Sequence, residues 1–492
     1  MRFPASTAVL VAAVALACSS RSDRHAPTLA LRDCQLVGQR GHGRIQARCG
    51  VLQVPEDWAR PDGARLDLKV AVIPARGVAD PAPVFALAGG PGQAATEQHV
   101  SMMAALSQAQ RDRDVVLVDQ RGTGALSTLK CDLGEAVEDP DALSNEKEAA
   151  LVDRCLKEVR GDPRHYTTLD FVRDLDAARE ALGYERIHLF GVSYGTRAAL
   201  AYLRAYPDRA RTAVLDSVAP PSMLVGDQMA LTGQRALDLD FQRCAATSAC
   251  ATRFPDLPAA LERVLDHLQR QPQPVKLRHP TTNAPVEVTL TRFGFARTAQ
   301  FYSYTPELVG LLPLLIHGAD GAADLSPVAA QVLHAQELLE GGLSRPLYFS
   351  VICAEDVPFF GEAPARAGWL PERSYLGDSV RSELKRVCAR WPHTAVDRSF
   401  KEPVRSAVPV LLLSGEADPV TPPEFAEEAR RALSHSVHVV VKGHGHNVSP
   451  RGCLPSLIGQ LERTSAVEGL DVGCAADIAP APMFLDFLGH EP

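Results

Sequence analysis

The sequence predicts an α/β protein whose mostly parallel sheet is covered by helices on both faces. Short apolar runs at residues 83–88, 115–118 and 187–190 alternate with longer segments of helical character. This alternation is typical of parallel sheets with crossover helices. Each run ends in a loop of glycine or polar residues. Parallel sheets bind ligands at the carboxyl ends of their strands, so we expect the functional site at that edge.

The first elements along the chain indicate a β-hairpin. Residues 51–54 and 66–73 alternate apolar with polar or basic side chains, and a segment rich in Pro, Asp and Gly separates them. Such a pattern is typical of two strands joined by a turn. The strand at 83–88 then ends in the loop 89–92, which reads Gly-Gly-Pro-Gly, and the strand at 115–118 ends in the loop 119–124.

A GxSxG box with Ser193 at its centre is the most informative motif. Gly191 and Gly195 flank it, the apolar run 187–190 precedes it, and a helix-forming stretch at 196–206 follows. This layout is typical of a nucleophile elbow, a sharp strand-to-helix turn that exposes a serine hydroxyl. Glycines are needed there because the turn is strained and its neighbours pass close to the helix. We expect Ser193 to be a catalytic nucleophile.

A serine nucleophile that forms a tetrahedral intermediate needs two fixed N–H donors for the oxyanion. One comes from the residue after the nucleophile and the other from the loop after an earlier strand. Tyr194 supplies the first amide, and Gly90 is the candidate for the second. A plain turn at Gly90 is the alternative, because glycine and proline mark loops in general.

The nucleophile also needs a base, and the base needs an acid that holds its tautomer. Apolar runs at 408–413 and 437–441 are each followed by a polar loop, and these loops contain Asp418 and His446. The chain order Ser, Asp, His is the order that this kind of elbow requires. We therefore expect Asp418 as the acid and His446 as the base.

Each of these roles has a rival in the sequence. His444 lies two residues from His446, and Asp216 follows the apolar run 212–215. We expect His446 as the base on motif position, and a structural role for Asp216 in its turn. Glu416 is expected to cap the helix after the acid loop.

The composition excludes several classes of protein. The chain has 492 residues, of which 46% are hydrophobic, so it can bury a large core. Its formal net charge of −8 gives no electrostatic case for nucleic acid binding. No CxxC pair or HExxH box is present, so we expect neither a zinc site nor another cofactor.

The N-terminus is predicted to be a bacterial secretory signal, residues 1–17. Arg2 gives a positive end, residues 8–17 include a short apolar stretch, and small residues precede Cys18. The stretch is too short to span a bilayer. Residues 15–18 resemble a lipobox, with Ala15 in place of the usual Leu. We therefore expect an exported protein in the periplasm or cell envelope, lipid-anchored through Cys18, with free secretion as the alternative.

Eleven cysteines leave one unpaired in an all-disulfide scheme, and Cys18 is the odd one because it lies at the processing site. An oxidising compartment permits disulfides between the other ten. Buried free thiols are the alternative, because sequence alone does not determine connectivity. The ten fall into pairs of sequence neighbours: Cys34 with Cys49, Cys131 with Cys155, Cys244 with Cys250, Cys353 with Cys388, and Cys453 with Cys474.

Four ordered motifs carry a family resemblance. They are the GGPG loop at 89–92, the DQRGTG loop at 119–124, the GxSYG elbow at 191–195 and the GxxDPVTP loop at 415–422. With His446 and the two C-terminal cysteines, they resemble the bacterial tripeptidyl aminopeptidase and prolyl aminopeptidase group of α/β-hydrolase serine peptidases. The resemblance covers the chain from about Cys34 to the C-terminus. Ala88 stands where prolyl aminopeptidases often have His, which weakens a strictly proline-releasing assignment.

The resemblance implies an α/β-hydrolase core, residues 18–221 and 403–492, interrupted by a largely helical cap at 222–402. The strand and helix alternation does break down in that segment. Apolar residues at helical spacing from Leu257 to Leu268 follow Asp256, a candidate N-cap. A cap excludes water and limits which chain ends enter, which favours an exopeptidase.

An aminopeptidase must bind a free α-amine, for which a carboxylate in the cap is the natural partner. The candidates are Glu355 and Asp356, where Glu355 occupies an acidic position that the resembled group often shows; solvated acids are the alternative. Phe301, Tyr302 and Tyr304 are candidates for a side-chain pocket, with a core role as the alternative.

The sequence therefore predicts an exported serine exopeptidase that releases N-terminal residues, dipeptides or tripeptides from short peptides through an acyl-enzyme. An ester or amide hydrolase with a non-peptide substrate is the alternative, because one fold hosts many chemistries. A non-catalytic envelope binding protein is disfavoured by the intact set of Ser193, Asp418 and His446. The oligomeric state is left open.

Overall fold

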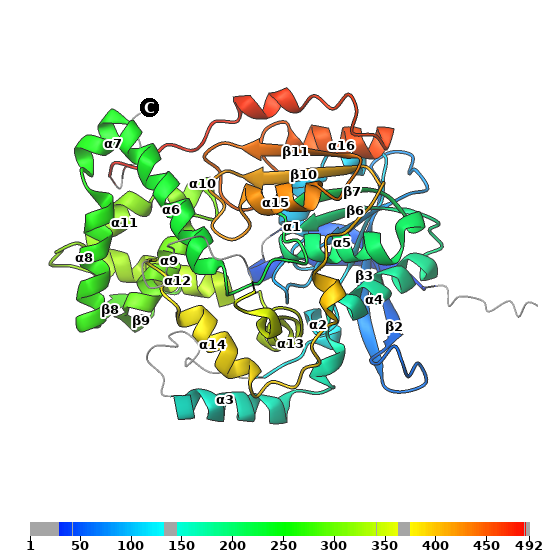
Figure 1. Cartoon of the computed structure of the whole chain (residues 1–492), viewed down its shortest axis with the longest axis horizontal. Helices are drawn as coiled ribbons and strands as arrows, with labels where there is room; N and C mark the ends of the chain where they lie inside the picture. The colour runs from blue at the N-terminus through cyan, green and yellow to red at the C-terminus, as the bar shows by residue number, and fades with distance from the viewer. Residues whose placement is uncertain are drawn as a thin grey trace, which may run out of the picture.

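A nine-stranded sheet forms the centre of the chain (Figure 1). The computed structural model describes residues 29–41, 43–131, 145–340, 342–362, 374–486 and 488; the expected signal segment and Cys18 lie outside them. The spatial order is β1-β2-β3-β5-β4-β6-β7-β10-β11, antiparallel from β1 to β5 and parallel from there on. The strands are β1 (Arg32–Val37), β2 (Arg44–Pro55), β3 (Arg65–Ile73), β4 (Val84–Leu87), β5 (Val115–Val118), β6 (Ile187–Val192), β7 (Ala210–Asp216), β10 (Val410–Gly415) and β11 (Ser436–Val441).

The expected hairpin and parallel strands are present, and the hairpin is the antiparallel pair β2 and β3. The apolar runs became strands because they are buried on both faces of the sheet. Along β6, Leu189 packs into the cluster that contains α4 and α5, and its neighbour Phe190 packs into the opposite one. The helices of the two faces are α4 (Thr168–Ala181), α5 (Tyr194–Ala205) and α15 (Pro423–Arg430) on one, and α1 (His99–Ala105) and α16 (Leu454–Thr464) on the other.

Two further helices lie before β6. They are α2 (Gly124–Ser127), which begins at the last residue of the 119–124 loop, and α3 (Asn145–Glu158). Arg121 of that loop is fully buried and forms a bidentate ion pair with Asp174 of α4, with donor–acceptor distances of 2.7 and 2.6 Å. This loop therefore holds α4 against the edge of the sheet.

The chain between β7 and β10 forms a separate helical layer, at the left and bottom of Figure 1. This layer is the expected cap, and it has its own apolar core around Leu261, Phe295 and Ile316. It also contains a two-stranded hairpin, which the sequence pattern did not indicate. The cap comprises α6 (Met229–Ala246), α7 (Ser248–Arg253), α8 (Leu257–Arg270), β8 (Gln273–Arg278), β9 (Pro285–Leu290), α9 (Arg292–Tyr302), α10 (Pro306–Val309), α11 (Leu312–Ala319), α12 (Ser326–Glu340), α13 (Arg345–Glu355) and α14 (Ser379–Cys388).

Local signals explain how several cap elements start. Asp256 is the N-cap of α8, where its carboxylate accepts a hydrogen bond from the Ala259 amide at 3.2 Å. Leu261, Val264, Leu265 and Leu268 then line the buried side of that helix. The predicted N-cap residue and the predicted apolar stripe of α8 are thus confirmed.

The described residues form five disulfides, and each joins one of the pairs of sequence neighbours. Cys34–Cys49 links the edge strand β1 to its neighbour β2, and Cys353–Cys388 links the cap helices α13 and α14. In the part of the chain that the structure describes, no helix has the length and apolarity needed to cross a membrane.

Candidate active site

The turn between β6 and α5 holds the Ser193 backbone in a conformation that residues other than glycine rarely adopt, with φ of 56° and ψ of −124°. The Ser193 amide donates a hydrogen bond to the Asp216 carbonyl at 2.9 Å, which ties the turn to β7. A Cβ on Gly191 would lie 2.5 Å from the Gly195 carbonyl oxygen, and one on Gly195 would collide with the Leu87 carbonyl. The two glycines are therefore required by close approach, and the turn presents the serine hydroxyl at the carboxyl edge of the sheet.

Asp418 and His446 reach the same edge from the loops after β10 and β11. The His446 Nδ1 lies 2.7 Å from the Asp418 Oδ2, and both side chains are almost fully buried. The Asp418 carboxylate also accepts hydrogen bonds from the Val420 amide, from the Thr421 amide and from the Thr421 hydroxyl, at 2.8 to 2.9 Å. These donors fix the carboxylate so that it orients the imidazole.

The electrostatics of the pair favour the charged state of each partner. Burial alone raises the pKa of Asp418, but the His446 charge and the hydrogen bonds to the carboxylate outweigh it, so this pKa is lowered. Burial alone lowers the pKa of His446, but the Asp418 charge and hydrogen bond outweigh it and raise the pKa above its ordinary value. A buried imidazole paired in this way can accept a proton and remain stabilised as an imidazolium.

The loop that carries His446 is held from two sides. On the core side, the Asp216 carboxylate accepts hydrogen bonds from the Val448 and Ser449 amides, at 3.1 and 2.9 Å. On the cap side, the His446 amide donates to the Tyr304 carbonyl at 2.6 Å, and the two rings meet edge to face with centroids 5.0 Å apart. Asp216 therefore has a structural role, as expected, but this role extends beyond its own turn to the loop that carries His446.

The other rivals lie elsewhere. The Nδ1 of His444 lies 3.0 Å from the Lys442 carbonyl, and His444 does not line the pocket that Ser193 and His446 share. The expectation that Glu416 caps the following helix is wrong. That helix begins at Pro423, and the Glu416 carboxylate instead accepts a hydrogen bond from the Gly443 amide at 2.9 Å, because the two loops lie side by side.

The expected oxyanion donors border the nucleophile. Gly90 has φ of 110° and lines the pocket beside Ser193, and Tyr194 is the first residue of α5. A buried network also fixes the Tyr194 side chain. Its hydroxyl contacts the Gln120 amide at 3.0 Å and the Thr168 hydroxyl at 2.7 Å.

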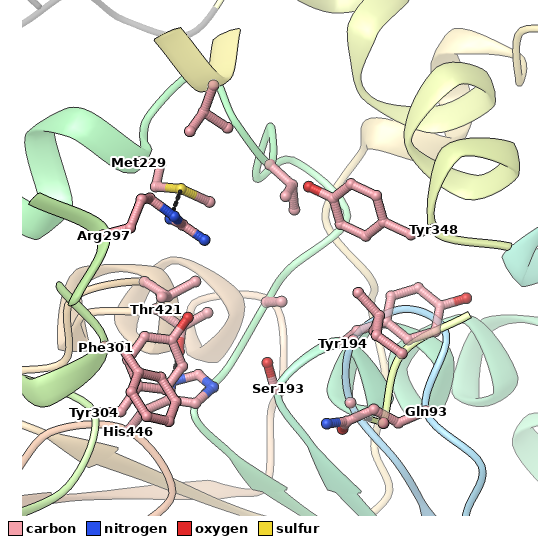
Figure 2. A pocket seen from close by; sticks show the side chains of 18 of the residues that line it. Gln93, Ser193, Tyr194, Met229, Arg297, Phe301, Tyr304, Tyr348, Thr421 and His446 are labelled. Atoms are coloured by element: carbon pink, nitrogen blue, oxygen red, sulfur yellow. Dashed lines mark hydrogen bonds between the residues drawn. The ribbon is translucent and has the colours of Figure 1, made fainter. Parts of the chain in front are cut away.

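A cavity of about 380 Å³ lies over Ser193, with the core as its floor and the cap as its walls. Figure 2 shows Ser193 and His446 at the floor, Tyr304 and Phe301 beside the histidine, and Tyr348 on the opposite wall. Of the aromatic residues proposed from sequence, Phe301 and Tyr304 line this cavity. Tyr302 does not, because its side chain is buried and its hydroxyl bonds to Gln331 in the cap core.

Glu355 and Asp356 lie below the cavity and do not line it. The Glu355 carboxylate accepts hydrogen bonds from the Thr168 amide at 2.7 Å and from the Thr168 hydroxyl at 2.8 Å. Asp356 forms ion pairs with Arg197 at 3.1 Å and with Lys401 at 2.6 Å. Both carboxylates are fully buried, so their geometry is that of a buried ion cluster under α5 and not of a group that meets substrate.

The cavity has charged residues that the sequence did not single out. Glu383 of α14 lines it with 13% of its side chain exposed, 3.7 Å from Arg345. Burial raises the pKa of Glu383, and the nearby positive charges of Arg345, Arg297 and Arg386 do not outweigh it. Arg297 of α9 also lines the cavity. One signal was available for Arg297: it lies one helical turn before Phe301, so the two share a helix face.

Among the described residues there is no group of three or more His, Cys, Asp or Glu side chains that could hold a metal ion.

Several known proteins are similar to this chain. The chain is 25% identical to a tripeptidyl aminopeptidase of Streptomyces coelicolor over 483 aligned residues, which cover 88% of this chain and 84% of that protein. It is 31% identical to the serine protease Hip1 of Mycobacterium tuberculosis over 199 residues, 36% of each chain. The crystal structure of a proline iminopeptidase from Mycobacterium smegmatis aligns with 85% of this chain and 98% of its own, at 19% identity and a TM-score of 0.39.

The expected resemblance to the tripeptidyl aminopeptidase group is thus confirmed at the level of sequence. The sequence model of the alpha/beta hydrolase fold family matches residues 82–450 of this chain. This range includes Ser193, Asp418, His446 and the whole cap. The chain therefore belongs to the alpha/beta hydrolase fold family.

Proposed function

We propose that this protein is an exported serine exopeptidase that releases N-terminal residues, dipeptides or tripeptides from short peptides. The observation that carries the proposal is a Ser-His-Asp set at the floor of a capped cavity whose wall holds one loosely paired carboxylate, Glu383. The similarity to tripeptidyl aminopeptidases along 88% of the chain supports the same conclusion.

In the proposed mechanism, the Ser193 hydroxyl attacks the scissile carbonyl while the free ring nitrogen of His446 accepts its proton. Asp418 holds the other ring nitrogen at 2.7 Å and stabilises the imidazolium. The amides of Tyr194 and Gly90 donate to the oxyanion. His446 then protonates the leaving amine, and water, activated by the same histidine, attacks the acyl-enzyme and releases the N-terminal fragment.

The free amine of the substrate is bound by Glu383 in this proposal. A largely buried carboxylate that accepts no hydrogen bond from a described residue is costly to keep ionised. A substrate ammonium supplies both the opposite charge and the missing donors. Glu383 thus takes the role for which Glu355 and Asp356 were candidates, because it faces the cavity and they face α5.

Export is part of the proposal and is supported by the N-terminal segment 1–17 with Cys18 and by the five disulfides. Disulfides of this number are typical of proteins that fold in an oxidising compartment. We place the mature protein in the cell envelope, attached through a lipid on Cys18.

The test is a substrate panel assayed with the wild type and with Ser193→Ala. The panel contains aminoacyl, dipeptidyl and tripeptidyl p-nitroanilides with free amines, the same compounds N-acetylated, and simple p-nitrophenyl esters. We expect Ser193-dependent cleavage of the free-amine anilides, with the acetylated partners cleaved at least about tenfold less well. Ester turnover without cleavage of any free-amine peptide would reject the peptidase function in favour of a non-peptide ester or amide substrate.

A further inference from the structure

Among the residues that the structure describes, three arginines line the cavity above Ser193, and they differ in their partners. Arg197 is fully buried and pairs with Asp356 and Glu355 at 3.1 and 3.5 Å. Arg345 lies 3.7 Å from Glu383 and over the ring of Phe349. Arg297 has no carboxylate within 4.0 Å among the residues that the structure describes. It is therefore the cavity arginine that forms no ion pair with a described residue, and only the more distant charge of Glu383 acts on it from across the cavity.

Most N–H groups of the Arg297 guanidinium also have no hydrogen-bond acceptor among the described residues. One nitrogen, Nη1, contacts the Gln300 side-chain oxygen and lies 3.3 Å from the Met229 sulfur. The described chain supplies no hydrogen-bond acceptor to Nε or Nη2. Figure 2 shows the guanidinium reaching into the cavity from the same side as Phe301 and Tyr304, above His446.

This arrangement is unlike that of an arginine which only supports the fold. A guanidinium presents five N–H donors in a rigid plane, and structural arginines satisfy them on carbonyls or carboxylates. Arg121 does so here, with one carboxylate and three backbone carbonyls around it. Arg297 instead holds its open donors towards the space that a substrate must occupy.

We propose that Arg297 is a specificity-determining residue that binds a carboxylate group of the peptide substrate. The inference rests on the proposed peptidase function. The physical reason is that the planar fork matches the two oxygens of a carboxylate, and the pair is strengthened where the cap excludes water. Arg297 supplies the positive counterpart to Glu383. The cavity would thus bind the ammonium group of a peptide at Glu383 and a carboxylate of the same peptide at Arg297.

A peptide can offer this carboxylate from two sources. One is the C-terminal carboxylate of a short leaving peptide, and the other is an Asp or Glu side chain in the released fragment. Both place the same chemical group against the same fork. Two pairs of substrates distinguish them, because in each pair a carboxylate is exchanged for its neutral amide and nothing else changes.

The experiment measures kcat/KM for both pairs with the intact mature enzyme. The first pair is Ala-Ala-Ala-Ala with a free C-terminus and its C-terminal amide. The second is Ala-Glu-Ala p-nitroanilide and Ala-Gln-Ala p-nitroanilide. The variants are Arg297→Gln and Arg297→Lys, and the matched control is Arg292→Gln, which removes a positive charge from the same helix but outside the cavity lining.

We expect the wild type to prefer the carboxylate in one of the two pairs by about tenfold or more, as a charge-assisted hydrogen bond implies. Arg297→Gln should bring that ratio close to one, Arg297→Lys should keep part of it, and Arg292→Gln should leave it unchanged. Because each ratio compares two substrates on one enzyme, a partial loss of folded protein does not affect it.

Two results would overturn the inference. One is a wild-type ratio near one in both pairs, and the other is a preference that persists in Arg297→Gln. If Ala-Ala-Ala p-nitroanilide is still cleaved in a Ser193-dependent manner, the peptidase function stands and only the role of Arg297 fails. If no free-amine peptide is cleaved, the proposed function fails, and inhibition of ester hydrolysis by the tetrapeptide against its amide decides the role of Arg297 alone.

Discussion

Two matched substitutions, Glu355→Gln and Glu383→Gln, separate a structural carboxylate from one that meets substrate. Both replace a glutamate of the cap with its neutral isostere, on α13 and α14 respectively. Glu355 is fully buried under α5, whereas Glu383 lines the cavity. We expect the first substitution to cost stability and the second to cost recognition of the substrate amine.

The magnitudes follow from the contacts. Glu355 accepts two short hydrogen bonds from Thr168 and faces Arg197 at 3.5 Å, so Gln removes charge from both interactions. Breaking a buried ion pair costs about 3 to 5 kcal/mol. Asp356 still compensates the charge of Arg197 in the variant, so we expect Glu355→Gln to lower the free energy of unfolding by about 2 to 3 kcal/mol. Among the described residues, Glu383 forms one ion pair, at 3.7 Å with the partly exposed Arg345, and burial disfavours its charge. Its replacement should therefore lower the free energy of unfolding by about 1 kcal/mol or less.

The assays are urea unfolding, followed by tryptophan fluorescence, and kcat/KM on tripeptidyl anilides with a free or an acetylated amine. Glu383→Gln should lose about ten- to a hundredfold on the free-amine substrate and little on the acetylated one, which corresponds to one charge-assisted hydrogen bond. Glu355→Gln should keep the wild-type ratio of the two substrates in its folded fraction.

The reverse pattern would refute this reasoning. It would be refuted by a Glu355→Gln variant that unfolds like the wild type and loses its preference for free amines, together with a Glu383→Gln variant that keeps that preference. Glu355 would then contact substrate, and the cavity geometry would not represent the complex.

Three other predictions concern the base and a buried acid. His446→Ala should lower kcat by about a thousandfold or more, while His444→Ala should stay within about tenfold, because His444 does not line the cavity; loss of activity in the His444 variant alone would reverse the assignment. Since Asp418 raises the pKa of His446 and the base must be neutral, kcat/KM should fall with an inflection above pH 6.5 as the pH drops, and an inflection below 6.5 would contradict the pairing. Burial raises the pKa of Glu462 from 4.5 to about 8, so the folded state holds this proton longer than the unfolded state. Stability should therefore decline between about pH 4.5 and 8, and Glu462→Gln should flatten that decline in unfolding measurements.

The triad could be predicted from sequence because each member follows a strand in the same parallel sheet. The run at 115–118 is strand β5 in full, and the runs before Ser193, Asp418 and His446 are β6, β10 and β11. Parallel strands bring their carboxyl ends to one edge whatever the chain does in between. For these residues, a local pattern of apolar runs and polar loops was therefore enough to predict that they meet in space.

The charged residues of the cavity could not be predicted in this way. Arg297, Arg345 and Glu383 lie on α9, α13 and α14, and nothing in local periodicity says how these cap helices pack together. The position of Glu355, two residues after a cysteine, pointed to a cap carboxylate. It did not show that Arg197, buried one turn after the nucleophile, would need that carboxylate as a partner.

The cap and the catalytic base are not independent parts. The carbonyl of Tyr304, just after α9, accepts the His446 amide at 2.6 Å, and a Cβ on Gly445 would collide with the Ser303 carbonyl. A shift of α9 would leave a buried donor without an acceptor, which costs about 1 to 3 kcal/mol. Substitutions on α9 that are aimed at specificity therefore also act on the rate through His446. For this reason Arg297 must be judged by the ratio of two substrates on one variant, since an absolute rate would mix the loss of a substrate contact with a displaced base.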